Sequence, residues 1–181
     1  MIISGSSSAH VKQAADALHA GELLGLPTET VYGLAADACN ETAVAKIFKA
    51  KGRPANHPLI VHVASAEAVT KFASEVPDFA QALMAQFWPG PLTLILPRKE
   101  DMAAAAAGGQ NSVGLRCPSH PVAREVLQAC ATQGVWGVAA PSANLFGRVS
   151  PTTAAHVQSE FGNELLILDG GECEVGIEST I

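Results

Sequence analysis

The chain has 181 residues, 48% of them hydrophobic and 15% charged, and this length and composition predict one domain with a buried core. Its 17 acidic and 11 basic residues leave a formal charge of −6, which argues against nucleic-acid binding over the whole surface. Only 5% of the residues are aromatic, which argues against a stacking platform for several exposed bases.

Cysteine spacing and the lengths of apolar runs indicate the compartment. Cys39, Cys117, Cys130 and Cys173 lie far apart and lack the paired spacing of a metal site, so we expect reduced and mostly buried thiols. Residues 1–8 have no basic flank or long apolar core, so no secretory signal is predicted. No apolar run approaches the roughly 20 residues needed to span a bilayer. We therefore predict a cytoplasmic protein without a membrane contact.

The N-terminal part begins an alternation of helices and strands. We predict a helix over residues 8–19, with Ser8 as its N-cap and Gly21 at its end. Residues 23–26 then form a short buried strand, which is the first strand that the pattern predicts.

A polar turn at residues 27–34 interrupts this apolar context. The hydroxyls of Thr28, Thr30 and Tyr32 could line a pocket at the end of a strand, where α/β sheets bind ligands. The turn could equally be structural, with Tyr32 packed beneath it. The spacing alone leaves both interpretations open.

A cationic segment over residues 46–62 is the most distinctive feature of this acidic chain, because no acidic residue falls within it. Its basic and imidazole side chains are Lys46, Lys49, Lys51, Arg53, His57 and His62. A helix over residues 41–51 is predicted to carry its first lysines, and a buried strand over residues 59–63 is predicted to follow.

Two interpretations of the cationic segment differ in what the cations do. Lysines near a helix C-terminus complement the helix dipole, which accounts for Lys46 and Lys49. The dipole accounts less well for Lys51 and Arg53, which project where Gly52 fixes the backbone. A planar guanidinium beside a compact ammonium suits a polyphosphate. We therefore predict an anion site that binds a small ligand.

The middle of the chain is predicted to contain two helices and a strand. Ser65 is expected to cap a helix, and a further helix covers residues 78–87. Residues 87–97 form a rigid turn that leads into a strand. Residues 100–111 include five consecutive alanines and two glycines, and they form either a short helix with a loop or a mobile flap.

A strand over residues 112–116 ends on Arg116, where an apolar residue would be expected. An arginine in such a place usually has an anionic partner, which is either a protein carboxylate or a substrate. Ser119 is expected to cap the next helix. A strand over residues 135–140 then leads to residues 141–144, whose small side chains would let a ligand approach the backbone.

The C-terminal part completes the fold class. Ser150 and Pro151 have the pattern of a helix start, and such an N-terminus facing the cationic segment would add N–H groups to an anion site. A strand over residues 165–168 follows, and the pattern stops at Ile181 without a cap or turn, which suggests truncation of a longer protein. The alternation predicts a single α/β layered domain over residues 1–181, with a twisted mixed sheet flanked by helices.

Six stretches taken together resemble the YrdC-type family of threonylcarbamoyl-adenylate synthases. They occur in the family's order and cover essentially the whole chain: residues 27–34, 49–62, 87–96, 112–118, 141–151 and 176–181. The resemblance implies a twisted mixed sheet with a deep, concave cationic groove. It also implies an enzyme that joins L-threonine, bicarbonate and ATP into threonylcarbamoyl-adenylate and releases pyrophosphate. A tRNA-modifying transferase complex would then use the product to modify an adenosine beside the anticodon.

The resemblance further implies roles for individual residues. Lys51 and Arg53 would be catalytic, because they would screen the repulsion between two anions and stabilise charge on the phosphoryl oxygens. The positions that would contact ATP are Arg53, His57, Ser112, Ser142, Asn144 and Ser150. The positions that would contact threonine are Thr30, Tyr32, His62, Arg116, Ala140 and Ser179.

Two of these residues have a more detailed expected role. Arg116 would hold the threonine carboxylate as a fork, and a neutral His62 could accept a proton from the amine. Mg²⁺ is expected to arrive with ATP, and no metal site within the protein is predicted, because no dedicated carboxylate pair is evident.

The chain departs from the family pattern in two ways. Some members carry Asn where His57 stands, so the contact at this position could differ in kind. Family chains also continue past residues 179–181 with an Arg-containing segment, and the longer branch adds a linker and a second domain. Because that C-terminal extension is absent from this sequence, we expect an incomplete nucleotide site.

Three other interpretations compete with the synthase. A carbamoyl-transfer domain like that of hydrogenase-maturation proteins would use a related groove, but such domains belong to larger chains with zinc-type cysteine pairs. An RNA-binding module would contact tRNA or double-stranded RNA through the basic groove, with a steep salt dependence and no need for ATP. A purely structural domain would use residues 46–53 only as a solvated helix end.

Overall fold

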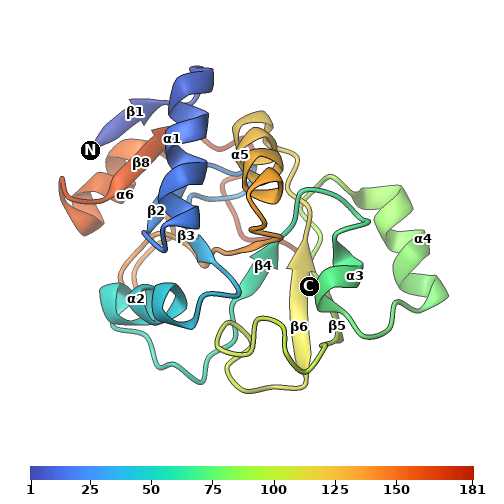
Figure 1. Cartoon of the computed structure of the whole chain (residues 1–181). Coiled ribbons are helices and arrows are strands. Elements are labelled where there is room, and N and C mark those ends of the chain that lie inside the picture. The colour runs from blue at the N-terminus through green and yellow to red at the C-terminus, as the bar shows by residue number, and fades with distance from the viewer.

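An eight-stranded sheet runs through the computed structural model, which describes residues 1–181 (Figure 1). The strands lie in the order β1-β8-β2-β3-β7-β4-β6-β5. They are β1 (Ile2–Ser4), β2 (Leu24–Leu26), β3 (Gly33–Asp37), β4 (Ile60–His62), β5 (Leu94–Pro97), β6 (Ser112–Arg116), β7 (Val138–Ala139) and β8 (Leu166–Asp169). The helices are α1 (Ser8–His19), α2 (Glu41–Lys51), α3 (Val69–Phe72), α4 (Asp78–Phe87), α5 (Pro121–Thr132) and α6 (Ala154–Phe161).

The sheet is mixed, which confirms the predicted α/β fold class. β8 is parallel to both of its neighbours, β1 and β2, and β4 is parallel to β6. The remaining pairs are antiparallel. The register pairs His62 of β4 with Arg116 of β6 on one side and with Val138 of β7 on the other. The ends of β4 and β6 therefore bring an imidazole and a guanidinium side by side.

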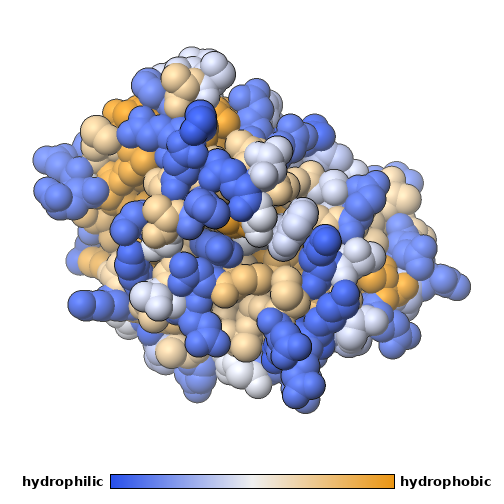
Figure 2. Space-filling model, in the orientation of Figure 1, coloured by the Kyte–Doolittle hydropathy of each residue, from blue (hydrophilic) through white to orange (hydrophobic).

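Two apolar clusters cover the two faces of the sheet. In β3, Leu34 belongs to a cluster of 29 buried residues, whereas the adjacent Ala35 belongs to one of 15. Because successive strand residues point to opposite faces, these clusters lie on opposite sides. α1 and α5 contribute Leu18 and Leu127 to the smaller cluster. On the face seen in Figure 2, hydrophilic residues predominate and hydrophobic ones form smaller areas.

Several helices start at a different residue from the one predicted. Ser7, and not Ser8, caps α1, because its side chain accepts a hydrogen bond from the N–H of His10. Residues after Ser65 form turns, and α3 is a single helical turn that begins only at Val69. A serine can satisfy its own turn as readily as a helix terminus, so the hydroxyl alone does not fix where a helix begins.

Ser119 and Ser150 are not helix caps either. His120 caps α5 through its ring Nδ1, which accepts the N–H of Val122 at 3.2 Å. Thr153 caps α6. Pro151 stays outside that helix, and its carbonyl oxygen accepts the N–H of Tyr32 at 2.8 Å. The predicted helix N-terminus at Pro151 is therefore wrong, because a long-range contact holds this proline in irregular chain.

Residues 100–111 form neither the short helix with a loop nor the mobile flap that the sequence left as alternatives. They form turns without a helix, and Ala103, Ala106 and Ala107 are buried. The carbonyl oxygen of Ala106 accepts the N–H of Leu59 at 2.7 Å. The alanine run is therefore a packed loop beside the start of β4.

Two further expectations concern cysteines and membranes. Cys117, Cys130 and Cys173 are buried, Cys39 is exposed, and all four are free thiols, as predicted for a mostly buried, reduced set. Burial raises the pKa of Cys130 to about 12. None of the helices combines the length and apolar character that crossing a lipid bilayer requires.

Candidate functional site

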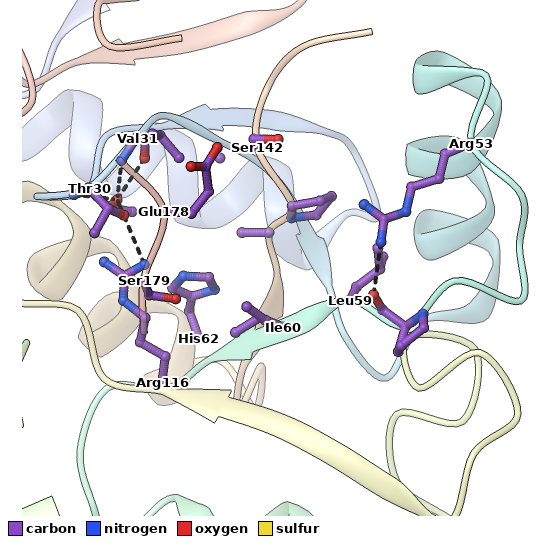
Figure 3. Close-up of a pocket in the computed structure, with 15 residues that line it drawn as sticks. Thr30, Val31, Arg53, Leu59, Ile60, His62, Arg116, Ser142, Glu178 and Ser179 are labelled. Atoms are coloured by element: carbon purple, nitrogen blue, oxygen red, sulfur yellow. Dashed lines mark hydrogen bonds between the residues drawn. The ribbon is translucent and has the colours of Figure 1, made fainter. Parts of the chain in front are cut away.

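A polar cavity of about 190 Å³ lies where the central strands end (Figure 3). Its walls come from the turn before β3, from the segment between α2 and β4, from the ends of β4 and β6, from the chain after β7 and from the C-terminal segment. The lining residues are Thr28, Thr30, Val31, Gly33, Arg53, Pro58, Leu59, Ile60, His62, Arg116, Ala140, Pro141, Ser142, Glu178 and Ser179. Segments far apart in the sequence thus converge on one cavity.

Arg116 is buried at the end of β6 and is held from two sides. Its Nη1 donates to the hydroxyl of Thr30 at 2.9 Å, and its Nη2 lies 2.7 Å from Oε1 of Glu29. The Glu29 carboxylate is buried too, and its Oε2 accepts the N–H of Ser119 at 3.1 Å. The protein-carboxylate alternative for the partner of Arg116 is therefore present in the structure.

The ion pair leaves hydrogen-bonding capacity on Arg116. The contact with Glu29 has poor hydrogen-bond geometry, and Nε and Nη2 of Arg116 are buried without a hydrogen-bond partner. Nε and Nη2 form one edge of the planar guanidinium, and such an edge matches a carboxylate bidentately. Arg116 is thus both anchored by the protein and chemically suited to an anionic ligand.

The imidazole of His62 is buried beside Arg116, and its Nδ1 has no hydrogen-bond partner. Burial in the first place, and then the charge of Arg116, lower the pKa of His62 to about 3. The ring is therefore uncharged at neutral pH, and it is part of the cavity lining.

The two cations of the predicted catalytic pair take different places. Arg53 lines the cavity, and its Nη2 donates to the carbonyl oxygen of Pro58 at 3.0 Å. Lys51 does not line the cavity. Its buried ammonium donates to the backbone carbonyl oxygens of Ser142 and Asn144. Burial lowers the pKa of Lys51 to about 8, which leaves the ammonium as the main form at pH 7.

Tyr32 is fully buried and does not line the cavity. Its hydroxyl donates to the carbonyl oxygen of Gly171 at 2.8 Å and accepts the N–H of Gly170 at 3.1 Å. Burial raises the pKa of Tyr32 to about 12. These contacts fit the structural interpretation of the turn, whereas Thr28 and Thr30 line the cavity.

The other predicted site residues divide into two groups. Those that line the cavity are Thr30, Ala140, Ser142 and Ser179, together with Arg53, His62 and Arg116. Asn144 is buried and does not line the cavity, and its side-chain amide donates to the carbonyl oxygens of Leu145 and Arg148. Ser112, at the start of β6, and His57, whose ring centroid lies 5.8 Å from that of Phe146, are also outside the lining.

Two acidic residues of the site escaped the sequence reasoning. Glu29 holds Arg116, and Glu178 lines the cavity and accepts a hydrogen bond from the hydroxyl of Ser150. The signal for Glu29 is its place in an otherwise buried run, where a carboxylate needs a partner. Nothing in the local pattern around Glu178 indicates its position.

The protein residues do not form a metal centre. No group of three or more His, Cys, Asp or Glu side chains lies close enough together to hold an ion. A nucleotide-bound Mg²⁺ takes several of its oxygen ligands from phosphates and water, so it does not require such a group.

The fold and the cavity define an α/β domain with a small polar cavity that two arginines line, and the comparisons agree with this fold class. A family model named for Sua5, YciO and YrdC and described as "Telomere recombination" matches residues 16–181. Threonylcarbamoyl-AMP synthase of Pyrococcus abyssi is 45% identical over 172 residues, which are 94% of this chain and 49% of the relative. The Bacillus subtilis synthase is 44% identical over 173 residues, with the same shares.

A solved structure gives the same result. The crystal structure of P. abyssi Sua5 complexed with L-threonine is 43% identical, has a TM-score of 0.94, and is matched over 99% of this chain and 53% of that one. The chain therefore belongs to the Sua5/YciO/YrdC family. It spans about half the length of these two curated relatives.

Proposed function

We propose that this chain carries the catalytic domain of a threonylcarbamoyl-AMP synthase, a nucleotidyltransferase that converts L-threonine, bicarbonate and ATP into threonylcarbamoyl-adenylate and pyrophosphate. The observation that carries the proposal is the placement of Arg53 and Arg116 on opposite sides of one polar cavity (Figure 3). One arginine can bind the threonine carboxylate, and the other can bind the ATP phosphates. The names of the relatives and the L-threonine in the Sua5 structure support the same reaction.

In this proposal the two arginines have separate tasks. Arg116 holds the threonine carboxylate through its guanidinium, whose position Thr30 and Glu29 fix. Arg53 holds the ATP phosphates. The threonine amine and bicarbonate first form a carbamate with loss of water. An oxygen of this carbamate attacks the α-phosphorus, the bond from that phosphorus to the oxygen that bridges to the β-phosphorus breaks, and pyrophosphate leaves. A fixed guanidinium stabilises the charge that develops on the phosphoryl oxygens without reorganising.

Lys51 supports this site indirectly. Its ammonium fastens the backbone at Ser142 and Asn144, and Ser142 lines the cavity. We therefore assign Lys51 the role of holding the wall of the nucleotide site, and assign Arg53 the direct contact with phosphate. The ATP contacts of His57, Ser112, Asn144 and Ser150 stay predictions, and they would need this wall to rearrange around the nucleotide.

His62 is better suited to accept a hydrogen bond than a proton. A group with a pKa near 3 holds a proton poorly at neutral pH, so it is a weak general base. Its uncharged ring lines the cavity and can instead orient the threonine amine by accepting a hydrogen bond. The amine proton would then pass to solvent or to bicarbonate.

The proposal also covers the metal ion, the cellular compartment and the macromolecular partners of the reaction. Mg²⁺ would enter with ATP, and no catalytic step is assigned to a protein-bound metal. The four free thiols suit the reducing cytoplasm, where a tRNA-modifying transferase complex would consume the product. Because the net charge is −6, any direct contact with tRNA or double-stranded RNA would use only a local part of the surface. The salt dependence of RNA binding would test for such a contact.

The test is pyrophosphate release from ATP, Mg²⁺ and bicarbonate, with and without L-threonine. We expect release that requires threonine and falls on the order of 100-fold or more in Arg53→Ala. Arg124→Ala is the matched control, because Arg124 is exposed and does not line the cavity. Release without threonine, or equal loss in both variants, would contradict the proposal.

A further inference from the structure

We propose that Thr93 is a positioning residue for the amino-acid site, and that it acts through Ser179. This inference rests on the function proposed above. Thr93 does not line the cavity, whereas Ser179 does. The side-chain Oγ1 of Thr93 lies 2.8 Å from Oγ of Ser179, and this is the one hydrogen bond that the Thr93 hydroxyl makes.

Thr93 holds the C-terminal segment by its backbone as well. Its N–H donates to the carbonyl oxygen of Thr180 at 2.8 Å, and the N–H of Thr180 donates to the carbonyl oxygen of Pro91 at 3.0 Å. Leu92 and Thr180 form a parallel β-bridge. Thr93 and the two residues before it therefore fix the chain that carries Ser179 into the cavity.

The side chain of Thr93 has one defined direction. Its methyl carbon lies over Gly114 of β6, where an added Cβ would come within 3.4 Å of it. Thr93 is 1% exposed, so its methyl and its hydroxyl are both shielded from water. A β-branched side chain has few χ1 conformations, and packing of the methyl on Gly114 selects the one that points the hydroxyl at Ser179.

The segment before Thr93 is tied to the strand that ends in Arg116. The indole N–H of Trp88 donates to the carbonyl oxygen of Leu92 at 2.7 Å. The N–H of Gly90 donates to the carbonyl oxygen of Cys117 at 2.8 Å. One rigid frame thus places both Arg116 and, through Thr93, Ser179, which are two of the polar groups around the cavity.

The hydrogen bond has a direct consequence for Ser179. A serine hydroxyl rotates freely unless a partner fixes it. The hydroxyl of Thr93 occupies one hydrogen-bonding direction of Ser179 Oγ, so the remaining directions are oriented before a ligand enters. Preorganisation of this kind raises affinity because the ligand does not have to order the group.

The experiment measures L-threonine binding to the whole chain by calorimetry. We expect Thr93→Val, which keeps the shape and removes the hydroxyl, to weaken binding about 5- to 10-fold, as the loss of one hydrogen bond would. Thr93→Ser should restore most of the affinity. Thr132→Val is the matched control, since its exposed hydroxyl on α5 donates only to a carbonyl of its own helix.

A double-mutant cycle with Ser179→Ala separates positioning from a general structural effect. If Thr93 acts through Ser179, then Thr93→Val should cause no further loss of affinity in the Ser179→Ala background. Equal losses in both backgrounds, or unchanged binding in Thr93→Val, would overturn the inference while leaving the proposed function standing. Failure of the unmodified chain to bind L-threonine would overturn both. A thermal melt of each variant confirms that the folded protein is compared.

Discussion

The ammonium of Lys51 donates a hydrogen bond to the backbone carbonyl oxygen of Asn144, and a second to that of Ser142. The cation at the exit of α2 is therefore directed at the chain beyond β7, and it does not itself line the cavity. Arg53, two residues later, lines the cavity instead. Lys51 and Arg53 thus have different partners, so we predict that substitutions of these two residues differ in their effect on the free energy of unfolding.

Lys51→Met should destabilise the protein, because it keeps the aliphatic stem and leaves two carbonyl oxygens without their donor. We expect the free energy of unfolding in urea to fall by about 2 to 4 kcal/mol. Arg53→Met should lower it by less than about 1 kcal/mol, since Arg53 makes one hydrogen bond in a partly exposed setting. Equal stability of the two variants would contradict the assigned role of Lys51.

The buried pair of Glu29 and Arg116 predicts strong non-additivity. Glu29→Leu alone should lower the free energy of unfolding by about 3 to 5 kcal/mol, because it leaves the Arg116 charge buried without compensation. Adding Arg116→Met should recover much of that loss, since both charges are then gone. Urea unfolding of the two single variants and the double variant measures this coupling, and simple additivity would show that the pair is not an energetic unit.

The fold could be predicted where a local signal decides the structure. α2 has the predicted bounds because Gly52 adopts φ 65°, a left-handed conformation that ends the helix. β1 was not predicted, because three residues carry little pattern and its partner β8 lies at the other end of the chain. β3 was missed because Gly33–Asp37 contains no β-branched or aromatic residue, and its strand conformation depends on pairing with β2 and β7.

For the candidate site, the sequence predicted which residues take part better than it predicted how their side chains are oriented. The sequence resemblance selected Arg53, His62 and Arg116, which the fold does bring to one cavity. It gave no information on where Tyr32 and Lys51 point, because that depends on contacts with residues more than ninety positions away in sequence, on the order of half the chain. The role of Glu29 depends on the position of Arg116, which the fold brings beside it from another part of the chain.

Tyr32→Phe should separate stability from binding. The variant removes the hydroxyl that joins the turn before β3 to Gly170 and Gly171, and we expect the free energy of unfolding to fall by about 1 to 2 kcal/mol. Because Tyr32 does not line the cavity, the affinity for L-threonine should stay within about twofold of the original, a free-energy change smaller than one hydrogen bond. A large loss of affinity at unchanged stability would place the hydroxyl in the binding site.

His62 should make the stability of the protein depend on pH below neutrality. The unfolded chain takes up a proton at this histidine near the ordinary histidine pKa of 6.5, whereas the folded protein does so only near 3, because the imidazole is buried beside Arg116. Between these values the unfolded state binds more protons, so stability is present in full above about pH 6.5 and is lost as the pH falls toward 3.

The measurement is urea unfolding between pH 4 and pH 7, an interval chosen around the usual range for a histidine. We expect the difference in unfolding free energy between the unmodified chain and His62→Gln to change by up to about 1.4 kcal/mol per pH unit below pH 6.5, because glutamine does not titrate. His19→Gln removes an exposed imidazole on α1 and serves as the matched control. Parallel pH profiles for the unmodified chain and His62→Gln would mean that the imidazole has the same pKa in the folded and unfolded states. In that case burial would not keep His62 uncharged, and the argument that its low pKa makes it a weak general base would fail.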